Sequence, residues 1–160
     1  MNISSIFIAR LTIPMEPFVI ATETCYEAQN IYIKIQTDTG IYGVGECSAF
    51  PMLVGETQDT CFYVGQDLAK IIKGKNPLEI ENRLKEFDAY IAFNSTIKSA
   101  FDMALYDIAA KEKNIPLYKY LGGDKKIIQT DLTIGIDTPE QMAEKAKRFI
   151  ADGEIGRAHV

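Results

Sequence analysis

The sequence of 160 residues contains few of the residues that build metal and disulfide sites. It has one histidine and three cysteines, and no two of the cysteines have the C-x-x-C spacing. An odd number of cysteines without a neighbouring histidine argues against a zinc site and against a complete disulfide framework. Cys25, Cys47 and Cys61 are therefore predicted to be free thiols in a reducing cytoplasm.

Long apolar runs and long runs of one charge are also missing. No stretch approaches the roughly 18 apolar residues of a membrane span, and the amino terminus lacks the basic and apolar regions of a signal peptide. We therefore expect no membrane partner and a cytoplasmic location. The net charge is -5, and lysine and arginine form no basic stripe that would neutralise phosphates. We therefore expect no nucleic-acid partner.

The remaining composition is that of a folded globular protein. Hydrophobic residues make up 47% and charged residues 24% of the sequence, which is enough apolar surface for a packed core. A chain of this length has room for one domain, or for one domain and the start of another.

The first fifty residues have the alternation of β-strands. Residues 3–13 alternate loosely and stop at Pro14, after which a loop is expected to about Tyr26. Residues 31–46 alternate on both sides of Asp38-Thr39-Gly40, a sequence typical of a hairpin turn. The pattern predicts a small antiparallel sheet.

Three helical patterns follow the strands, and each starts at a capping residue or a proline. The first is expected from Thr57 or Asp59 to Lys73-Gly74, the second from Asn76-Pro77 through Phe87, and the third from Ser95 or Thr96 through Ala109, before Gly122-Gly123. Strands followed by helices indicate an α+β domain.

Beyond Asp124 the pattern changes to one strand and one helix. Residues 132–136 are apolar and β-branched, Pro139 fits the first position of a helix, and the helix is expected to end near residue 153. One strand and one helix form the repeat of a parallel α/β barrel. A strand without neighbours is not buried, so we predict that residues 125–160 are poorly held in this chain.

Six short phrases occur in the order and spacing of one known family: TDTG at 37–40, GVGEC at 43–47, GET at 55–57, SAFDMALYD at 99–107, PLY at 116–118 and LGG at 121–123. Together they resemble the capping domain of the mandelate racemase and muconate lactonizing branch of the enolase superfamily. The resemblance covers residues 3 to about 153. Within that branch, PFVI at 17–20, GETQDT at 55–60 and TDLTI at 130–134 are similar to dipeptide epimerases, such as those acting on L-Ala-D/L-Glu.

The resemblance implies a two-part fold. Residues 1–124 would form an α+β enolase-like capping domain, and residues 125–153 the first strand and helix of a truncated (β/α)7β TIM-like barrel. Two cap loops would close the barrel mouth, here about Met15 to Tyr26 and Ala49 to Gly55. The residues expected to face substrate are Thr22, Glu23 and Thr24 in the first loop, Phe50, Met52 and Leu53 in the second, and Thr133 on the barrel strand.

The resemblance also implies a function for the full-length parent. It would be a Mg²⁺-dependent isomerase that moves the α-proton of a small-molecule dipeptide between two lysines, while three carboxylates hold the metal that stabilises the enediolate. An apolar second loop would cover the dipeptide and exclude water, although Phe50 and Leu53 could instead pack the loop against the cap. The resemblance also allows a homo-oligomeric parent.

Two other functions remain open. The parent could be a muconate cycloisomerase or an o-succinylbenzoate synthase-like enzyme, which share the cap and the metal. The chain could also be a non-catalytic binding module that evolved from the cap.

The end of the chain departs from the family. After Gly153 the family continues into a strand with a K-x-K motif, whereas this chain reads EIGRAHV at 154–160. That heptapeptide back-translates into a sequence similar to the opening of a sequencing adapter, so we expect a non-native tail. The catalytic lysines and metal ligands would lie beyond the truncation, so the fragment alone is expected to be inactive and to bind no metal. His159, in the tail, is expected to have no catalytic or metal-binding role.

Two aspartates on the third helix invite an acid/base interpretation. Asp102 and Asp107 are five residues apart, which places them on different faces of a helix. We instead predict two ion pairs at i,i+4 spacing, Lys98 with Asp102 and Asp107 with Lys111.

The second hairpin strand carries an acidic residue and two glycines. Glu46 could make structural hydrogen bonds or contact substrate. Gly43 and Gly45 lie within a strand, so they predict a bulge or a close approach of another backbone.

Overall fold

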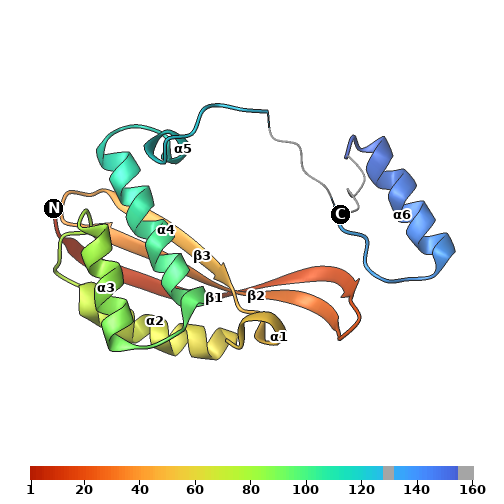
Figure 1. The fold of residues 1–160 in the computed structure, drawn as a ribbon, viewed down its shortest axis with the longest axis horizontal. Helices are drawn as coiled ribbons and strands as arrows, with labels where there is room; N and C mark the ends of the chain where they lie inside the picture. The colour runs from red at the N-terminus through yellow and green to blue at the C-terminus, as the bar shows by residue number, and fades with distance from the viewer. Residues whose placement is uncertain (128–131, 155–160) are drawn as a thin grey trace. The chain divides into compact units, whose positions relative to one another are not determined.

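The computed structural model describes residues 1–127 and 132–154. The chain divides into two compact units: a first unit of residues 1–13 and 28–124, and a second unit of residues 14–27 and 125–160. The elements are β1 (Ile3–Val19), β2 (Thr24–Thr37), β3 (Tyr42–Ser48), α1 (Pro51–Val54), α2 (Gln58–Ile72), α3 (Ile80–Tyr90), α4 (Ser95–Glu112), α5 (Leu117–Tyr120) and α6 (Pro139–Ala151) (Figure 1).

The sheet has three strands in the order β1-β2-β3. β2 and β3 are antiparallel, with Asn30 opposite Ser48 at one end and Gln36 opposite Tyr42 at the other. Their turn is closed by a hydrogen bond from Thr37 N to Ile41 O (2.9 Å). The predicted hairpin is confirmed.

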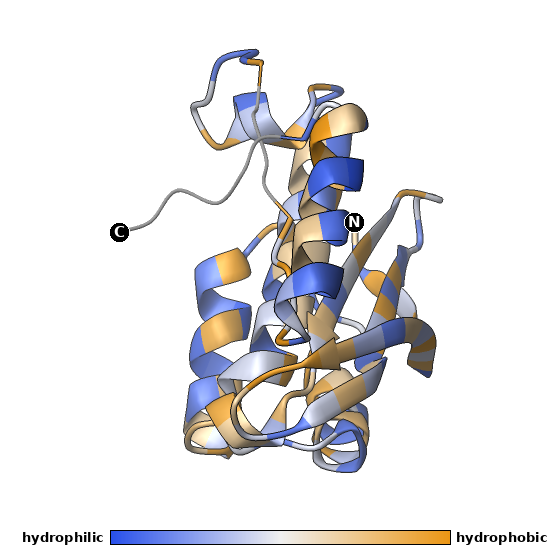
Figure 2. Cartoon of the chain, turned by 90° about the vertical axis from the view of Figure 1, so that its right-hand side faces the viewer, coloured by the Kyte–Doolittle hydropathy of each residue, from blue (hydrophilic) through white to orange (hydrophobic). Residues whose placement is uncertain are grey.

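Alternation along β2 separates a buried face of the sheet from a solvated one. Ile31, Ile33 and Ile35 are fully buried, whereas the residues between them remain partly exposed. Figure 2 shows the corresponding bands of hydrophobic and hydrophilic colour along the strands. Each buried isoleucine contributes roughly 1.5–3 kcal/mol relative to an exposed one, so the alternation fixes which face the helices cover.

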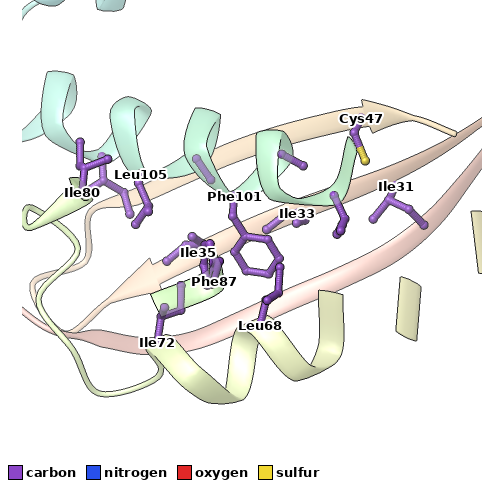
Figure 3. Packing of buried hydrophobic residues seen from close by; sticks show 14 of the residues in the cluster. Ile31, Ile33, Ile35, Cys47, Leu68, Ile72, Ile80, Phe87, Phe101 and Leu105 are labelled. Carbon is purple, nitrogen blue, oxygen red and sulfur yellow. The ribbon is translucent and has the colours of Figure 1, made fainter. Parts of the chain in front are cut away.

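Helices cover the buried face. α4 packs against β3, and α2 and α3 pack against α4. In Figure 3 the isoleucines of β2 lie opposite Leu68 of α2 and Phe101 of α4. The Phe101 ring meets that of Phe87 edge to face, with centroids 5.2 Å apart. The first unit is therefore a two-layer α+β fold, with strands first and helices after them, as expected.

Two glycines allow α4 to approach β3 closely. A Cβ atom at Gly43 would collide with Ala104 O, and one at Gly45 would collide with Ala100 O. The backbone of the helix therefore lies directly on the strand at these positions. The close backbone approach expected of these glycines is confirmed.

Local signals place α2 correctly and the start of α3 incorrectly. Thr57 caps α2, with a reciprocal pair of bonds between Thr57 and Thr60. α3 starts at Ile80 rather than at Pro77. The reason is that Asn76 Oδ1 accepts a hydrogen bond from Leu78 N (3.0 Å), which holds the chain in a turn before the helix begins.

β1 is longer than the sequence pattern suggested. It runs through Pro14 to Val19, and β2 begins at Thr24, so the expected loop from 14 to 26 is wrong. Proline is excluded from central strands because it lacks an N–H group, but β1 is at the edge of the sheet, where this N–H is not needed.

The described part of residues 125–160 contains a helix, and it shows no barrel strand. α6 has the predicted start, because Thr138 Oγ1 accepts a hydrogen bond from Gln141 N (3.3 Å). Residues 132–135, which the structure describes, form no strand, and Ile136 N donates to Val19 O (2.9 Å). A strand requires a hydrogen-bonded neighbour, so the expectation of a barrel strand over 132–136 is wrong for this chain. The expected tail from residue 155 on, with His159, lies outside the described residues.

Candidate functional site

The expected second mouth loop contains a short helix, α1. Phe50 precedes the helix in an extended conformation, and Pro51 is its first residue. Met52 is 60% and Leu53 80% exposed, whereas Phe50 is half-buried. The structure therefore brings the three expected residues of this loop together on one turn, and two of them present apolar side chains to solvent.

One end of this turn is hydrogen-bonded to β2, and the other is closed by a hydrogen bond within the turn. Ala49, which is buried, donates from its N–H to Gln29 O (2.9 Å). At the other end, Gly55 adopts φ 73° and donates to Pro51 O (2.9 Å). Because a side chain is strained at such a φ, glycine suits this position. The turn is thus held at its base while its apolar side chains point outward.

Glu56 follows this turn directly and was not among the expected site residues. It is only 8% exposed. Its Oε1 accepts a hydrogen bond from Thr96 N (3.1 Å), and its Oε2 accepts one from the Cys61 thiol (3.5 Å). The expected caps Ser95 and Thr96 are therefore wrong, because the carboxylate of Glu56 satisfies the first turn of α4. The GET motif was the only signal in the sequence.

The first expected loop is the turn between β1 and β2. Ile20 N donates to Glu23 O (2.9 Å), which closes the turn. Thr22 and Glu23 are exposed and Thr24 is half-buried. Glu23 Oε1 also accepts a hydrogen bond from the Cys25 thiol (3.5 Å). Burial, followed by this hydrogen bond, raises the pKa of Cys25 above its usual value.

Thr133, the last of the expected substrate residues, is exposed and lies in the segment that forms no strand. Gly135 packs against the backbone of Val19 and the ring of Phe18 in the same unit. The structure therefore places Thr133 in a segment held beside the end of β1, rather than inside a barrel.

The charged residues of the first unit are mostly engaged in structural contacts. Asn30 Nδ2 donates to Glu46 Oε1 (2.6 Å), which favours the structural interpretation of Glu46. Asp107 Oδ2 accepts from Lys111 Nζ (2.7 Å) and from Val44 N (2.9 Å), so the expected pair is confirmed and also ties α4 to β3.

The second expected pair on α4, Lys98 with Asp102, is wrong. Lys98 Nζ instead donates to Asp88 Oδ1 (2.8 Å) and to Ile91 O (2.7 Å). Asp88 lies in α3 and Ile91 directly follows that helix, so the packing of α3 against α4 supplies both acceptors in place of the neighbour one turn along α4.

The three cysteines are free, as predicted. The hydrogen bond with Cys47, followed by burial, raises the pKa of Cys61 far above its usual value, so this thiol stays protonated at neutral pH. Cys61 is therefore a small core residue that donates to Glu56.

The described residues do not fit a magnesium site. Among them, no group of three or more histidine, cysteine, aspartate or glutamate side chains is arranged to hold a metal ion. Mg²⁺ requires several oxygen ligands in octahedral geometry. Within the same residues, no helix has the length and apolar character needed to cross a membrane.

Comparison with known proteins agrees with this architecture. The family model for the mandelate racemase / muconate lactonizing enzyme N-terminal domain matches residues 3–122. The chain is 48% identical over 139 residues to a D-Ala-D/L-Ala epimerase of Cytophaga hutchinsonii, covering 86% of this chain and 38% of that protein. It is 31% identical to the L-Ala-D/L-Glu epimerase of Bacillus subtilis, covering 96% of this chain and 42% of that protein. The chain thus spans about two fifths of the length of these curated relatives.

Solved structures show the same fold. The dipeptide epimerase of Cytophaga hutchinsonii, in complex with Mg and the dipeptide D-Ala-L-Val, matches with a TM-score of 0.92 and 44% identity over 95% of this chain and 42% of that one. The dipeptide epimerase of Enterococcus faecalis, in complex with Mg and L-Leu-L-Tyr, matches with a TM-score of 0.93 and 31% identity over 100% of this chain and 46% of that one.

Proposed function

Because the chain belongs to the family of mandelate racemase / muconate lactonizing enzyme N-terminal domains, in the enolase superfamily, we propose that it is the capping part of a Mg²⁺-dependent dipeptide epimerase. The observation that carries the proposal is the 48% identity to a D-Ala-D/L-Ala epimerase. Relatives that bind Mg and a dipeptide support the substrate and the metal.

In this proposal residues 1–124 form the cap and residues 154–160 are a non-native tail. Residues 125–153 begin the barrel only in the longer protein, where further strands supply the neighbours that a strand requires. The metal, when bound in the barrel, stabilises the negative charge that develops as the α-proton leaves. The catalytic lysines and the metal ligands belong to the barrel, so the chain of 160 residues is inactive alone.

The contribution of this chain to the reaction is specificity and the exclusion of water. Met52 and Leu53 are exposed on a turn that is hydrogen-bonded to β2 at its base. In this proposal they cover the apolar part of the dipeptide. A water-excluding cover strengthens the electrostatic interactions of the reacting groups. Thr22, Glu23 and Thr24 supply polar contacts from the β1–β2 turn, and Thr133 supplies one from the start of the barrel.

The test uses the longer protein that results when the natural coding sequence is read past Gly153. It is incubated with Mg²⁺ and a panel of alanine-containing dipeptides in D₂O, and deuterium at the α-carbon is measured by mass spectrometry. We expect exchange and inversion at one α-carbon, no exchange after the metal is chelated, and none with the chain of 160 residues. Cycloisomerisation or elimination without such exchange would replace the epimerase assignment, and a coding sequence that stops at Val160 would favour a binding module.

The role of α1 is tested in the same protein. Leu53→Ser is expected to raise KM for apolar dipeptides severalfold and to change kcat little, because Leu53 contacts the substrate and takes no part in proton transfer. Leu78→Ser, which changes another exposed leucine of the first unit, is the control. An equal effect of the two substitutions would argue against substrate contact by α1.

A further inference from the structure

A cavity of the first unit lies between α3 and α4, and no residue of α1 lines it. Its volume is about 360 Å³. Its apolar walls include Leu84, Phe87 and Phe93, and its charged groups are Asp88, Lys98 and Asp102. Pockets for small ligands usually start at about 300 Å³ and are mostly apolar with a few polar groups, so this cavity is large enough for a small ligand.

The charges in the cavity do not balance. Lys98 is neutralised by Asp88, with 2.8 Å between Nζ and Oδ1. Asp102 is left over: its Oδ1 is buried and has no hydrogen-bond partner among the described residues. One lysine against two aspartates leaves the cavity with an excess of one negative charge at Asp102.

A buried carboxylate oxygen without a donor is unfavourable by about 1–3 kcal/mol or more. Burial, followed by the charge of Glu81, also raises the pKa of Asp102 above its usual value. A cation in the cavity would offset the negative charge of this carboxylate.

The rim of the cavity has an unusual backbone. Phe93 and Asn94 are consecutive non-glycine residues with φ of 57° and 53°. This left-handed conformation is unfavourable for residues with a Cβ atom. The Phe93 side chain, which lines the cavity, is 92% exposed and so is available to a ligand.

We propose that this cavity binds a small primary ammonium compound with an apolar body. The ammonium group donates a hydrogen bond to the carboxylate of Asp102, and the apolar body lies against Leu84 and Phe93. A divalent metal ion fits less well, because it needs several oxygen ligands and only one carboxylate of the cavity is unpaired. The proposal does not depend on the epimerase function.

The test is a calorimetric and NMR titration of the 160-residue chain with benzylamine at pH 7, where the amine is charged. Benzyl alcohol, which has a similar shape and no charge, is the matched probe. We expect saturable binding of benzylamine, with NMR chemical-shift changes at residues of α3 and α4. Benzyl alcohol should bind about tenfold more weakly or worse, because it cannot make the charge-assisted hydrogen bond.

Three variants locate the binding. Asp102→Asn keeps the shape and removes the charge, so it is expected to weaken benzylamine binding by about tenfold or more. Glu112→Gln makes the same charge change at an exposed position of the same helix and should leave binding unchanged. Phe93→Ala, which alters an exposed side chain and so spares the core, should also weaken binding. Absence of saturable binding, equal binding of the two probes, or equal loss in Asp102→Asn and Glu112→Gln would overturn the proposal.

Discussion

Single residues hold the candidate loop and the helix beside it in place, and Glu56 serves both. Its carboxylate accepts the N–H of Thr96 at the start of α4, where Asn94, the residue before the helix, provides no side-chain cap among the described residues. The same residue ends the turn that carries Met52 and Leu53. A change at Glu56 should therefore affect the stability of α4 and the position of the turn.

Replacing Glu56 by alanine is expected to lower the free energy of unfolding by about 1–3 kcal/mol, because a buried N–H and a buried thiol lose their acceptor. Glu56→Gln should have a smaller effect, since its amide oxygen can still accept from Thr96. Urea unfolding followed by circular dichroism measures both. Changes below about 0.5 kcal/mol for both variants, the size usual for surface substitutions, would show that this capping bond contributes little.

Asp102 should make stability depend on pH in the direction opposite to that of an ion-paired aspartate. Its pKa is raised in the folded state, so the folded protein binds the proton more tightly than the unfolded chain does. The contribution of Asp102 to stability is therefore most favourable below the pKa of the unfolded chain, near pH 4. This contribution falls as pH rises through the pKa of the folded state. Asp102→Asn removes this loss. Thermal unfolding should find the variant more stable than the original protein at pH 7, with a difference that shrinks towards pH 4; a difference that grows towards acid pH would contradict the sign.

At the level of the elements, the sequence predicts those turns and helix boundaries that depend on residues nearby in the chain. The hairpin turn at 38–40 and the start of α2 at Thr57 follow from local residue types, and both are correct. The extension of β1 through Pro14 depends on its edge position, and the cap of α4 depends on a carboxylate 40 residues earlier. Neither dependence is visible in a local pattern.

The candidate site shows the same difference between features set by nearby residues and features set by distant contacts. The family resemblance pointed to a loop from about Ala49 to Gly55, and the structure has the short helix α1 within that stretch. The sequence missed the unpaired Asp102, since the pairing of Lys98 with Asp88 depends on how α3 and α4 pack. The partners of charged residues follow from the fold and not from their spacing on one helix.

The contact between α4 and β3 predicts a strong effect of size at Gly45. Gly45→Ala is expected to destabilise the first unit by about 2 kcal/mol or more, because the new Cβ must push the backbone of α4 away from the strand. Gly40→Ala, in the same hairpin, meets no atom within 4 Å and has only its φ of 88° as a penalty, so about 1 kcal/mol is expected. Urea unfolding compares them; equal effects would show that the close approach is easily relaxed.

At the level of the whole molecule, the two units differ in how much they bury. The buried hydrophobic cluster of the first unit includes residues of every strand and of α2, α3 and α4. α4 alone has eight buried residues. In contrast, none of the 13 residues of α6, all of which are described, is buried. The curated relatives are more than twice as long as this chain.

Exposure of α6 predicts that it opens without unfolding of the first unit. Isolated helices shorter than about 12–15 residues are marginal in water, and the ion pairs of α6, such as Lys145 with Asp137 (3.0 Å), are partly exposed and so add little. Hydrogen exchange of the 160-residue chain should therefore find the amides of residues 142–151 exchanging by local opening, long before those of residues 99–112 in α4, which require unfolding of the core. Because both helices are measured in one sample, α4 is the internal control. Equal protection of the two helices would mean that α6 is held by contacts stronger than its exposure indicates, and would remove the argument that this segment depends on a longer chain for its stability.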